Sequence, residues 1–125
     1  MTVELEIVGE APLAAGEIER LVVLALRSAA IADGHLAIEF VDEARIRELN
    51  RDHRALDEPT DVLSFPIDGA GDVAGPRELG DIVICPQHAA DIGEAVVHGV
   101  LHLLGMDHEA DDGEMLARQR ELLGR

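Results

Sequence analysis

Residues 98–108 read His-Gly-Val-Leu-His-Leu-Leu-Gly-Met-Asp-His, and this stretch decides how the rest of the chain is arranged. His98 and His102 are four residues apart, so on a helix their side chains stack on one face and can bind the same metal ion. Gly105 can adopt the left-handed backbone conformation that ends a helix, which lets His108 return as a third ligand. Three histidines that leave one coordination position open are typical of a catalytic zinc site. The spacing therefore predicts a zinc ion bound by these three residues.

The apolar residues of the same stretch fall on a different face of the predicted helix. At about 100° per residue they occupy an arc of about 160°, and His98 and His102 lie outside it. A single histidine in this position would be better explained as a hydrogen-bonded core residue. Two on one stripe, with a third beyond a glycine turn, favour a metal site. The apolar residues are Val96, Val97, Val100, Leu101, Leu103 and Leu104.

The spacing of the three histidines equals that of the metzincin proteases, whose motif is H-E-x-x-H-x-x-G-x-x-H. In those enzymes the residue after the first histidine is the glutamate that takes a proton from the metal-bound water. Here that residue is Gly99. Because peptide hydrolysis needs the missing base, we interpret the stretch as a zincin-like metal site for a different substrate, and we expect no cleavage of casein. Replacing Gly99 with Glu is predicted to be the exchange that tests whether the missing base prevents peptide hydrolysis.

The composition is that of one soluble, acidic domain. At 125 residues the chain is long enough for a core without disulfides, and its single cysteine, Cys85, fits a reducing compartment. We expect Cys85 to be a small buried residue at the end of a strand. The N-terminus lacks the pattern of a signal peptide and no apolar run approaches about 20 residues, which predicts a cytoplasmic protein without a membrane partner. Phe40 and Phe65 are the only aromatic residues, so a wide base-stacking platform is excluded.

The chain carries 26 acidic and 10 basic residues, for a formal charge of −16. Overall this charge opposes binding to nucleic acid and to anionic membranes. All the basic residues are arginine, and four of them lie between positions 45 and 54. We assign Arg45 and Arg51 to a solvated helix face. Arg54 is expected in the loop before the next motif, where its guanidinium can bind a phosphate with two hydrogen bonds.

Apolar periodicity predicts four strands and four helices. The first two strands should be antiparallel, because residues 36–41 continue the alternation of residues 3–7. A single two-layer α+β domain of residues 1–125 follows, with a mixed four-stranded sheet, about four helices and the metal site at the sheet edge. The expected strands are residues 3–7, 36–41, 62–65 and 80–85. The expected helices are residues 12–31, 43–50, 86–104 and 113–123, the last capped by Asp111-Asp112 with Met115, Leu116, Leu122 and Leu123 facing inward.

Other polar residues near these motifs allow two interpretations. Asp107 either braces the turn or a ligand imidazole, or is a plain loop residue. Asp61 and Ser64 either line the cleft or cap the start of a strand. For the remaining histidines the sequence indicates no chemical role. We expect His35 and His88 to be exposed and functionally silent, and the role of His53 stays open.

Three motifs follow one another along the chain. They read Pro-Thr-Asp-Val-Leu-Ser-Phe-Pro at residues 59–66, Leu-Gly-Asp-Ile-Val-Ile-Cys-Pro at residues 79–86, and the histidine stretch at residues 98–108. Taken together they resemble the YbeY family of bacterial metal-dependent endoribonucleases, which act in rRNA maturation and ribosome quality control. The resemblance covers most of the chain.

The resemblance implies a zinc ion on His98, His102 and His108, and a functional arginine just before the Pro-Thr-Asp turn, which here is Arg54. These four residues are then the catalytic residues. The implied fold is a single α+β domain with a mainly four-stranded sheet. The implied function is a zinc-dependent, single-strand-specific endoribonuclease of 16S rRNA 3′-end maturation, with the ribosome or ribosomal proteins as partners.

Two departures from the family's pattern bear on substrate binding more than on the metal. Members commonly carry aromatic residues where this chain has Met106 and His53, so base stacking near the site is expected to be weaker. The segment between Pro86 and His98 is also shorter than in the family.

Two other functions stay open on the residues alone. One is a ribosome-associated module with a structural zinc ion and little catalysis, whose acidic surface would suit basic ribosomal proteins. The other is a metallopeptidase, against which Gly99 speaks. Water and the RNA 2′-hydroxyl are both candidate nucleophiles, and nickel or cobalt could replace zinc.

Overall fold

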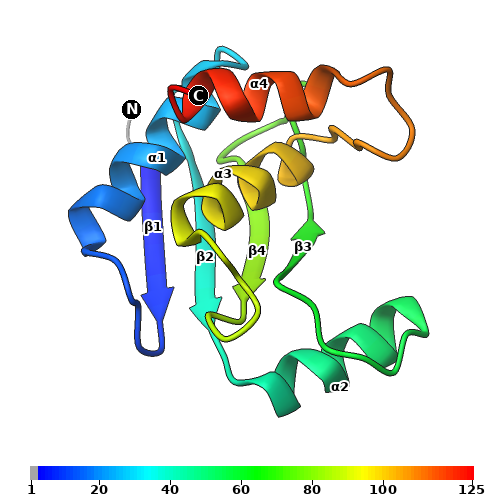
Figure 1. Ribbon diagram of the computed structural model, residues 1–125. Helices are drawn as coiled ribbons and strands as arrows, with labels where there is room; N and C mark the ends of the chain where they lie inside the picture. Colours follow the sequence, from blue (N-terminus) through cyan, green and yellow to red (C-terminus); the bar gives the residue numbers. More distant parts are fainter. Residues whose placement is uncertain (1–2) are drawn as a thin grey trace.

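The computed structural model describes residues 3–125 (Figure 1). In this part of the chain, four helices accompany a mixed four-stranded sheet, as predicted, and none of them is long and apolar enough to span a membrane. The strand order is β1-β2-β4-β3, with β1, β2 and β4 parallel and β3 antiparallel. The elements are β1 (Val3–Val8), α1 (Ala15–Arg27), β2 (Gly34–Phe40), α2 (Glu43–Arg54), β3 (Val62–Pro66), β4 (Glu78–Ile84), α3 (Ile92–Leu103) and α4 (Glu114–Leu122).

β1 and β2 are parallel, so the antiparallel pairing predicted from their alternation is wrong. Their register places Leu5 opposite Leu36. α1 connects the two strands as a crossover, which parallel neighbours require. The alternation arises because Glu4 and Glu6 project from a face of the sheet that is exposed to solvent. An exposed face says nothing about the direction of the neighbouring strand.

α2 is longer than predicted and includes Arg54. Asp42 caps its start as expected, since its Oδ1 accepts a hydrogen bond from the backbone N–H of Arg45 at 2.9 Å. The helix continues past Asn50 until Ala55 adopts the left-handed conformation with φ of 59°. Arg54 is therefore the last residue of a helix, and its expected place in a loop is wrong. The last turn of α2 is polar throughout, so it carries no apolar periodicity from which its extent could be predicted.

α1 and α3 are shorter than predicted. α1 stops short of both ends of residues 12–31. α3 does not begin at Pro86, because residues 86–91 form a turn that ends in a helix cap. In this cap the Asp91 carboxylate accepts a hydrogen bond from the backbone N–H of Glu94 at 3.1 Å.

The N-cap residue of α4 is Gly113 and not either of the predicted residues Asp111 and Asp112, but Asp111 still bonds to the start of the helix. Its carboxylate accepts hydrogen bonds from the backbone N–H groups of Gly113 at 2.9 Å and Met115 at 3.0 Å. Met115 is fully buried, whereas Leu116 is 36% exposed, so the prediction that Leu116 faces inward is wrong. Adjacent helical residues point about 100° apart, and the narrow contact of α4 with the core accommodates only one of the two.

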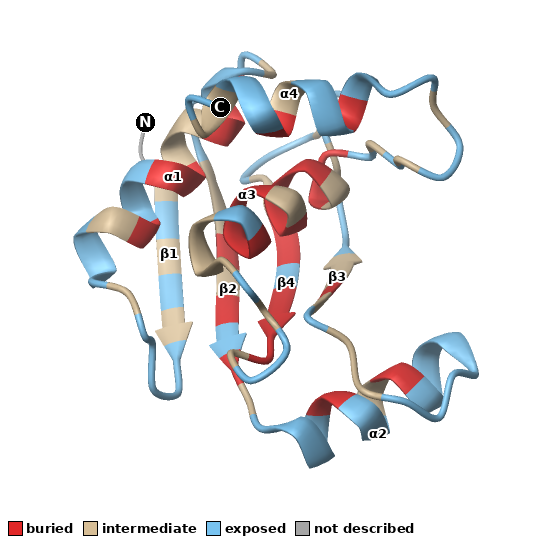
Figure 2. Ribbon diagram, viewed as in Figure 1, coloured by how far each residue is buried: buried red, intermediate tan, exposed pale blue. Residues whose placement is uncertain are grey.

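The core has two parts, on opposite faces of the sheet (Figure 2). The larger cluster lies between the sheet and helices α1, α3 and α4, and it buries the apolar arc predicted for residues 96–104. Val83 alternates along β4 with Ile82 and Ile84 of that cluster, so it faces the other way and packs under α2. The smaller cluster consists of Ile46, Leu63, Val83 and Cys85, which confirms that the cysteine is buried.

α3 approaches β4 closely because residue 99 has no side chain. A methyl group at Gly99 would lie 2.7 Å from Cγ2 of Ile82, closer than two carbon atoms can pack. The Gly99 carbonyl accepts a hydrogen bond from Ser64 Oγ of β3 at 3.1 Å. A side chain at position 99 would therefore point into the sheet. The exchange of Gly99 for Glu would test packing instead of catalysis, which corrects the expectation drawn from the motif.

We expect Gly99→Ala to lower the free energy of unfolding by about 1–3 kcal/mol, the usual cost of overpacking a core. Gly16→Ala in α1 is the matched control, because a methyl group there meets no described atom within 4 Å. Alanine also favours a helix over glycine by up to about 1 kcal/mol. Urea unfolding of both variants measures the difference, and a Gly99→Ala variant as stable as the wild type would contradict the packing role.

His35 belongs to an ion-pair cluster on the outer face of the sheet and is partly buried, so the expectation that it is exposed is wrong. Its Nδ1 lies 2.6 Å from Oε1 of Glu78 in β4, and its Nε2 lies 3.2 Å from Oε1 of Glu6 in β1. The hydrogen bond with Glu78, followed by that with Glu6, raises the pKa of His35 above its usual value. His88 is exposed, as expected, with its Nε2 3.4 Å from Oε2 of Glu43.

The raised pKa of His35 makes its contribution to stability depend on pH. The folded chain binds this proton more tightly, so the contribution is complete below the pKa of the unfolded chain, about 6.5, and is lost as pH rises through the higher folded pKa. We expect the difference in unfolding free energy between wild type and His35→Ala to be larger near pH 5.5 than near pH 8.5. Glu78→Gln should remove most of the same pH dependence. A difference that does not vary with pH would show that the cluster leaves the proton affinity of His35 unchanged.

Candidate metal centre

α3 and the turn after it bring the three predicted histidines together. His98 and His102 lie one turn apart on α3, and His108 follows the turn. The ring centroids are 4.7 Å apart for His98 and His102, and 5.1 Å and 5.6 Å from these two to His108. One nitrogen of each half-buried ring lies within 4.8 Å of the other two. Zinc–nitrogen bonds are about 2.0–2.1 Å long, so a small inward movement of the rings would fit one ion.

Backbone hydrogen bonds at the end of α3 form the turn that brings His108 back toward His98 and His102. Gly105 has φ of 94°, and its N–H donates to the carbonyl of His102 at 3.0 Å. The N–H of Met106 donates to the carbonyl of Leu101 at 3.1 Å. This pair of hydrogen bonds is a Schellman motif, which requires the left-handed residue that glycine supplies. The predicted role of Gly105 is therefore confirmed.

Asp107 braces the segment that carries His108. Its carboxylate accepts a hydrogen bond from the backbone N–H of Glu109 at 2.9 Å. Its carbonyl accepts hydrogen bonds from the N–H groups of Ala110 at 3.1 Å and Asp111 at 3.0 Å. These contacts favour the bracing interpretation of Asp107 over that of a plain loop residue.

The surroundings of the histidines favour metal binding. Burial lowers the pKa of His102, and the neighbouring imidazoles of His98 and His108 lower it further. A histidine with a lowered pKa is neutral at physiological pH, and the neutral imidazole is the form that binds a metal. His108 Nδ1 is buried and has no hydrogen-bond partner in the described part of the chain. Three imidazoles with an unsatisfied nitrogen fit a divalent transition metal.

One polar contact of this centre is not predictable from the histidine motif. The Nδ1–H of His98 donates a hydrogen bond to Oε1 of Gln119 in α4, at 2.8 Å. Gln119 is only 6% exposed. Its position four residues after Met115 places it on the inward face of the last helix. A polar side chain on such a face is the one indication in the sequence that a buried partner exists.

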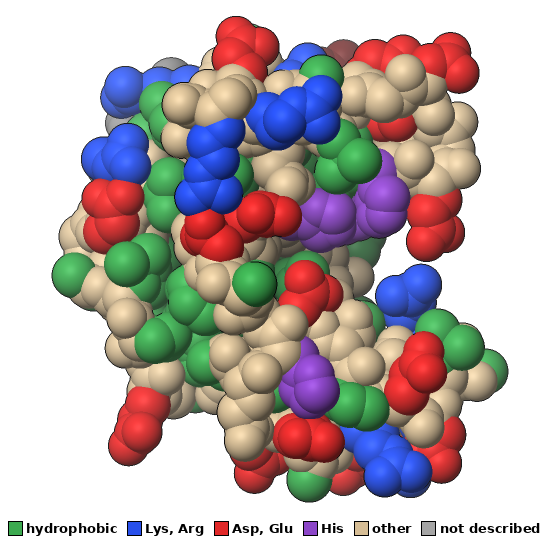
Figure 3. Space-filling view, in the orientation of Figure 1, with side chains coloured by type: hydrophobic (Ala, Val, Ile, Leu, Met, Phe, Trp, Pro, Cys, Tyr) green, Lys and Arg blue, Asp and Glu red, His purple; other side chains and the backbone are tan. Residues whose placement is uncertain are grey.

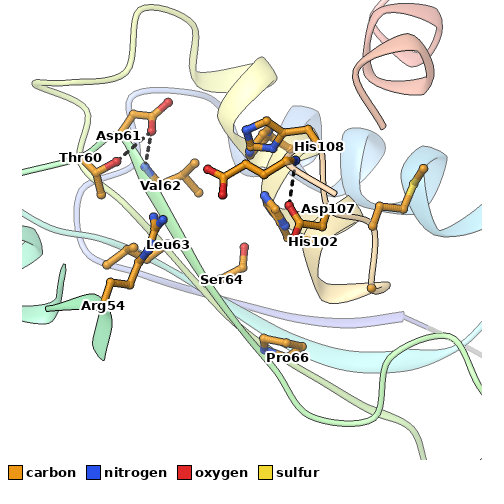
Figure 4. Close-up of a pocket in the computed structure, with 14 residues that line it drawn as sticks. Arg54, Thr60, Asp61, Val62, Leu63, Ser64, Pro66, His102, Asp107 and His108 are labelled. Atoms are coloured by element: carbon orange, nitrogen blue, oxygen red, sulfur yellow. Dashed lines mark hydrogen bonds between the residues drawn. The ribbon is translucent and has the colours of Figure 1, made fainter. Parts of the chain in front are cut away.

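The histidines and Arg54 line the same cleft, which has a volume of about 620 Å³. Residues 60–64 and Pro66, which comprise most of β3 and the turn before it, form the wall between them (Figure 4). Figure 3 shows the hollow at the right of the molecule, with histidine side chains above it and a basic side chain below it. β3 is an edge strand, so the histidine centre lies at the sheet edge, as predicted.

Arg54 differs from the other arginines of residues 45–54, because it forms no ion pair with any described residue. It is exposed and lies on the side of the cleft opposite His102 and His108 (Figure 4). An unpaired guanidinium can bind a phosphate without first breaking a salt bridge. The other three arginines are paired, as Arg45–Glu48 at 2.8 Å, Arg47–Asp57 at 2.9 Å and Arg51–Asp52 at 3.3 Å.

Asp61 has both of the roles considered for it, whereas Ser64 lines the cleft but does not cap the start of a strand. Asp61 Oδ1 accepts hydrogen bonds from the backbone N–H of Val62 at 2.9 Å and from Thr60 Oγ1 at 3.3 Å, which caps the start of β3. Ser64 is tied to α3 through the carbonyl described above. Both side chains also line the cleft.

Met106 and His53 lie in different surroundings. Met106 lines the cleft and packs against the larger core cluster. His53 packs edge-on against Phe65, with ring centroids 4.9 Å apart, and does not belong to the cleft wall. Of these two positions, only Met106 bears directly on base stacking inside the cleft.

A zincin-like group of three histidines, carried by a helix and its following turn and facing a cleft at the sheet edge, defines an α+β fold with a group that could hold a metal ion. The chain belongs to the YbeY family, because the family model described as Endoribonuclease YbeY matches residues 10–125.

Curated relatives and a solved structure agree with this assignment. Endoribonuclease YbeY of Bacillus cytotoxicus is 41% identical over 86% of this chain and 83% of its own. Endoribonuclease YbeY of Geobacillus thermodenitrificans is 38% identical over 100% of this chain and 97% of its own. That alignment spans 151 positions against 125 residues here, so 26 positions have no residue in this chain. The solution structure of TM1509 from Thermotoga maritima matches with a TM-score of 0.57 and 30% identity, over 95% of this chain and 86% of that one.

We expect the purified protein to bind one divalent metal ion per chain and His102→Ala to bind none, because two imidazoles hold such an ion too weakly. His35→Ala is the matched control, since His35 lies on the exposed face of the sheet and outside the cleft. Elemental analysis of protein purified without added metal measures the content. A full complement of metal in His102→Ala would rule out the three-histidine site.

Proposed function

We propose that this protein is a zinc-dependent endoribonuclease specific for single-stranded RNA. In this proposal it acts in the cytoplasm, as one domain of residues 1–125, in 16S rRNA 3′-end maturation and ribosome quality control. The observation that carries the proposal is the shared cleft, in which three histidines face an arginine that no described residue neutralises. The printed name of the relatives, endoribonuclease YbeY, supports the same reaction.

Different residues of the cleft would have different roles in phosphodiester cleavage. Zinc on His98, His102 and His108 would supply a Lewis acid and hydroxide near neutral pH. Arg54 would bind phosphate oxygens from the opposite wall through its planar guanidinium. Phosphoryl transfer depends on positioning and charge stabilisation more than on a carboxylate base. Gly99 is therefore compatible with this reaction, whereas peptide hydrolysis would lack its base.

The charge of the molecule opposes the binding of free RNA. A formal charge of −16 repels a polyanion over most of the surface. Among the described residues that line the cleft, Arg54 is the one arginine. Three acidic residues line it as well, namely Asp61, Asp107 and Glu109. Free RNA should therefore bind weakly, through few phosphates. Basic ribosomal proteins bound to the acidic surface would hold rRNA near the cleft, which supports the ribosome as partner.

We expect Arg54→Ala to lower kcat/KM for a short single-stranded RNA by about 10- to 100-fold, the loss of one charge-assisted phosphate contact. Arg54→Lys should recover part of this loss, because lysine keeps the charge but not the planar fork. Arg51→Ala is the matched control, since Arg51 is paired with Asp52 and does not line the cleft. Equal losses for Arg51→Ala and Arg54→Ala would mean that the arginines act only through general charge.

The metal dependence of the same assay separates the competing functions. A chelator and His102→Ala should each abolish RNA cleavage, and re-addition of zinc should restore it to the chelated wild type alone. RNA binding without cleavage would favour a ribosome-associated zinc module. Cleavage that continues at full rate in His102→Ala would point to a contaminating nuclease. Cleavage of casein would favour the metallopeptidase.

A further inference from the structure

We propose that Gln119 of α4 is a positioning residue of the metal centre, whose amide oxygen holds His98 in the tautomer that can bind the metal. This inference rests on the proposed metal binding by the three histidines. It does not depend on which substrate the loaded protein cleaves.

The hydrogen bond between the two side chains determines which ring nitrogen of His98 is available. Gln119 Oε1 lies 2.8 Å from His98 Nδ1 and can only accept, so Nδ1 must carry the proton. Nε2 then keeps its lone pair, which a metal requires. Without the acceptor, His98 would exchange between two tautomers, and one of them has its proton on the nitrogen needed for the metal.

α4 holds Gln119 in place from both sides. Before it, Met115 is fully buried one turn away on the same face of α4. After it, the guanidinium of Arg125 forms ion pairs with Asp91, the cap of α3, and with Glu94 in the first turn of α3. α4 is therefore attached to the core near its start and to the first turn of α3 just beyond its end, and it lies next to α3 in Figure 1.

Burial supports a role toward His98 rather than one in packing alone. Glutamine is seldom buried, and a buried amide needs hydrogen-bond partners. Gln119 is 6% exposed, and His98 is the side chain that its oxygen contacts in the described part of the chain. An apolar side chain of similar length would fill the same space without that contact. Among the three histidines, the described residues provide such a side-chain partner for His98 alone.

Two apolar variants and one conservative variant separate the hydrogen bond from the packing. Gln119→Leu and Gln119→Met keep the volume and remove the acceptor. We expect them to bind zinc about 10- to 100-fold more weakly, the usual effect of losing the partner of a metal-ligating histidine. Gln119→Glu keeps an acceptor oxygen and should restore the affinity. Gln87→Leu is the matched control, because Gln87 Oε1 accepts a hydrogen bond from the backbone N–H of Glu43, outside the cleft.

Two measurements decide the outcome without any activity assay. Competition with a chromophoric chelator gives the zinc affinity of each variant, and ¹⁵N NMR of the metal-free protein reports the tautomer of His98. The proposal requires weaker zinc binding and a mixed tautomer in the apolar variants, both reversed in Gln119→Glu. It is overturned if the apolar variants bind zinc as tightly as the wild type, or if Gln119→Glu binds as weakly as they do. A wild-type protein that binds zinc with this pattern but cleaves no RNA would refute the proposed function alone.

Discussion

The packing of α3 against β4 is the contact on which the site depends. Gly99 lets the helix lie directly on Ile82, and the apolar arc on the same side is buried in the larger core cluster. Because all positions of a helix are related by a fixed rotation, burial of that arc also determines where His98 and His102 point. A rotation of α3 by one residue, about 100°, would bury a histidine in place of an apolar side chain. The interaction that stabilises the fold therefore also directs two of the three histidines of the proposed metal site.

Features that depend on local periodicity could be predicted from the sequence. The histidine spacing, the buried arc and the turn at Gly105 all lie within one helix and its end, so the metal group and its place at the sheet edge follow from a short stretch. Strand direction does not follow, because the exposed Glu4 and Glu6 produce the same alternation in a parallel or an antiparallel pair. The position of Arg54 was missed for a related reason, since the last turn of α2 is polar and has no apolar pattern to mark it as helix.

Contacts between distant segments were the least predictable. His35 meets Glu6 and Glu78 only because β2 lies between β1 and β4. Gln119 meets His98 only because α4 packs against α3. In each case the residue types are ordinary for an exposed strand or a helix, and their chemistry appears when the fold brings the partners together. Such partners cannot be read from spacing along the chain.

The two sides of the cleft are held by different parts of the structure. The histidine side is contained in residues 98–119, where Gln119 bonds to His98 and backbone hydrogen bonds form the turn before His108. The Arg54 side depends on the position of α2, which packs on the smaller core cluster and carries Arg54 as its last residue. Under the proposed function, changes that loosen α2 would therefore weaken RNA cleavage while leaving metal affinity intact. A chain that lacks 26 aligned positions of a relative can keep a complete metal group for the same reason, because that group is built within one continuous segment.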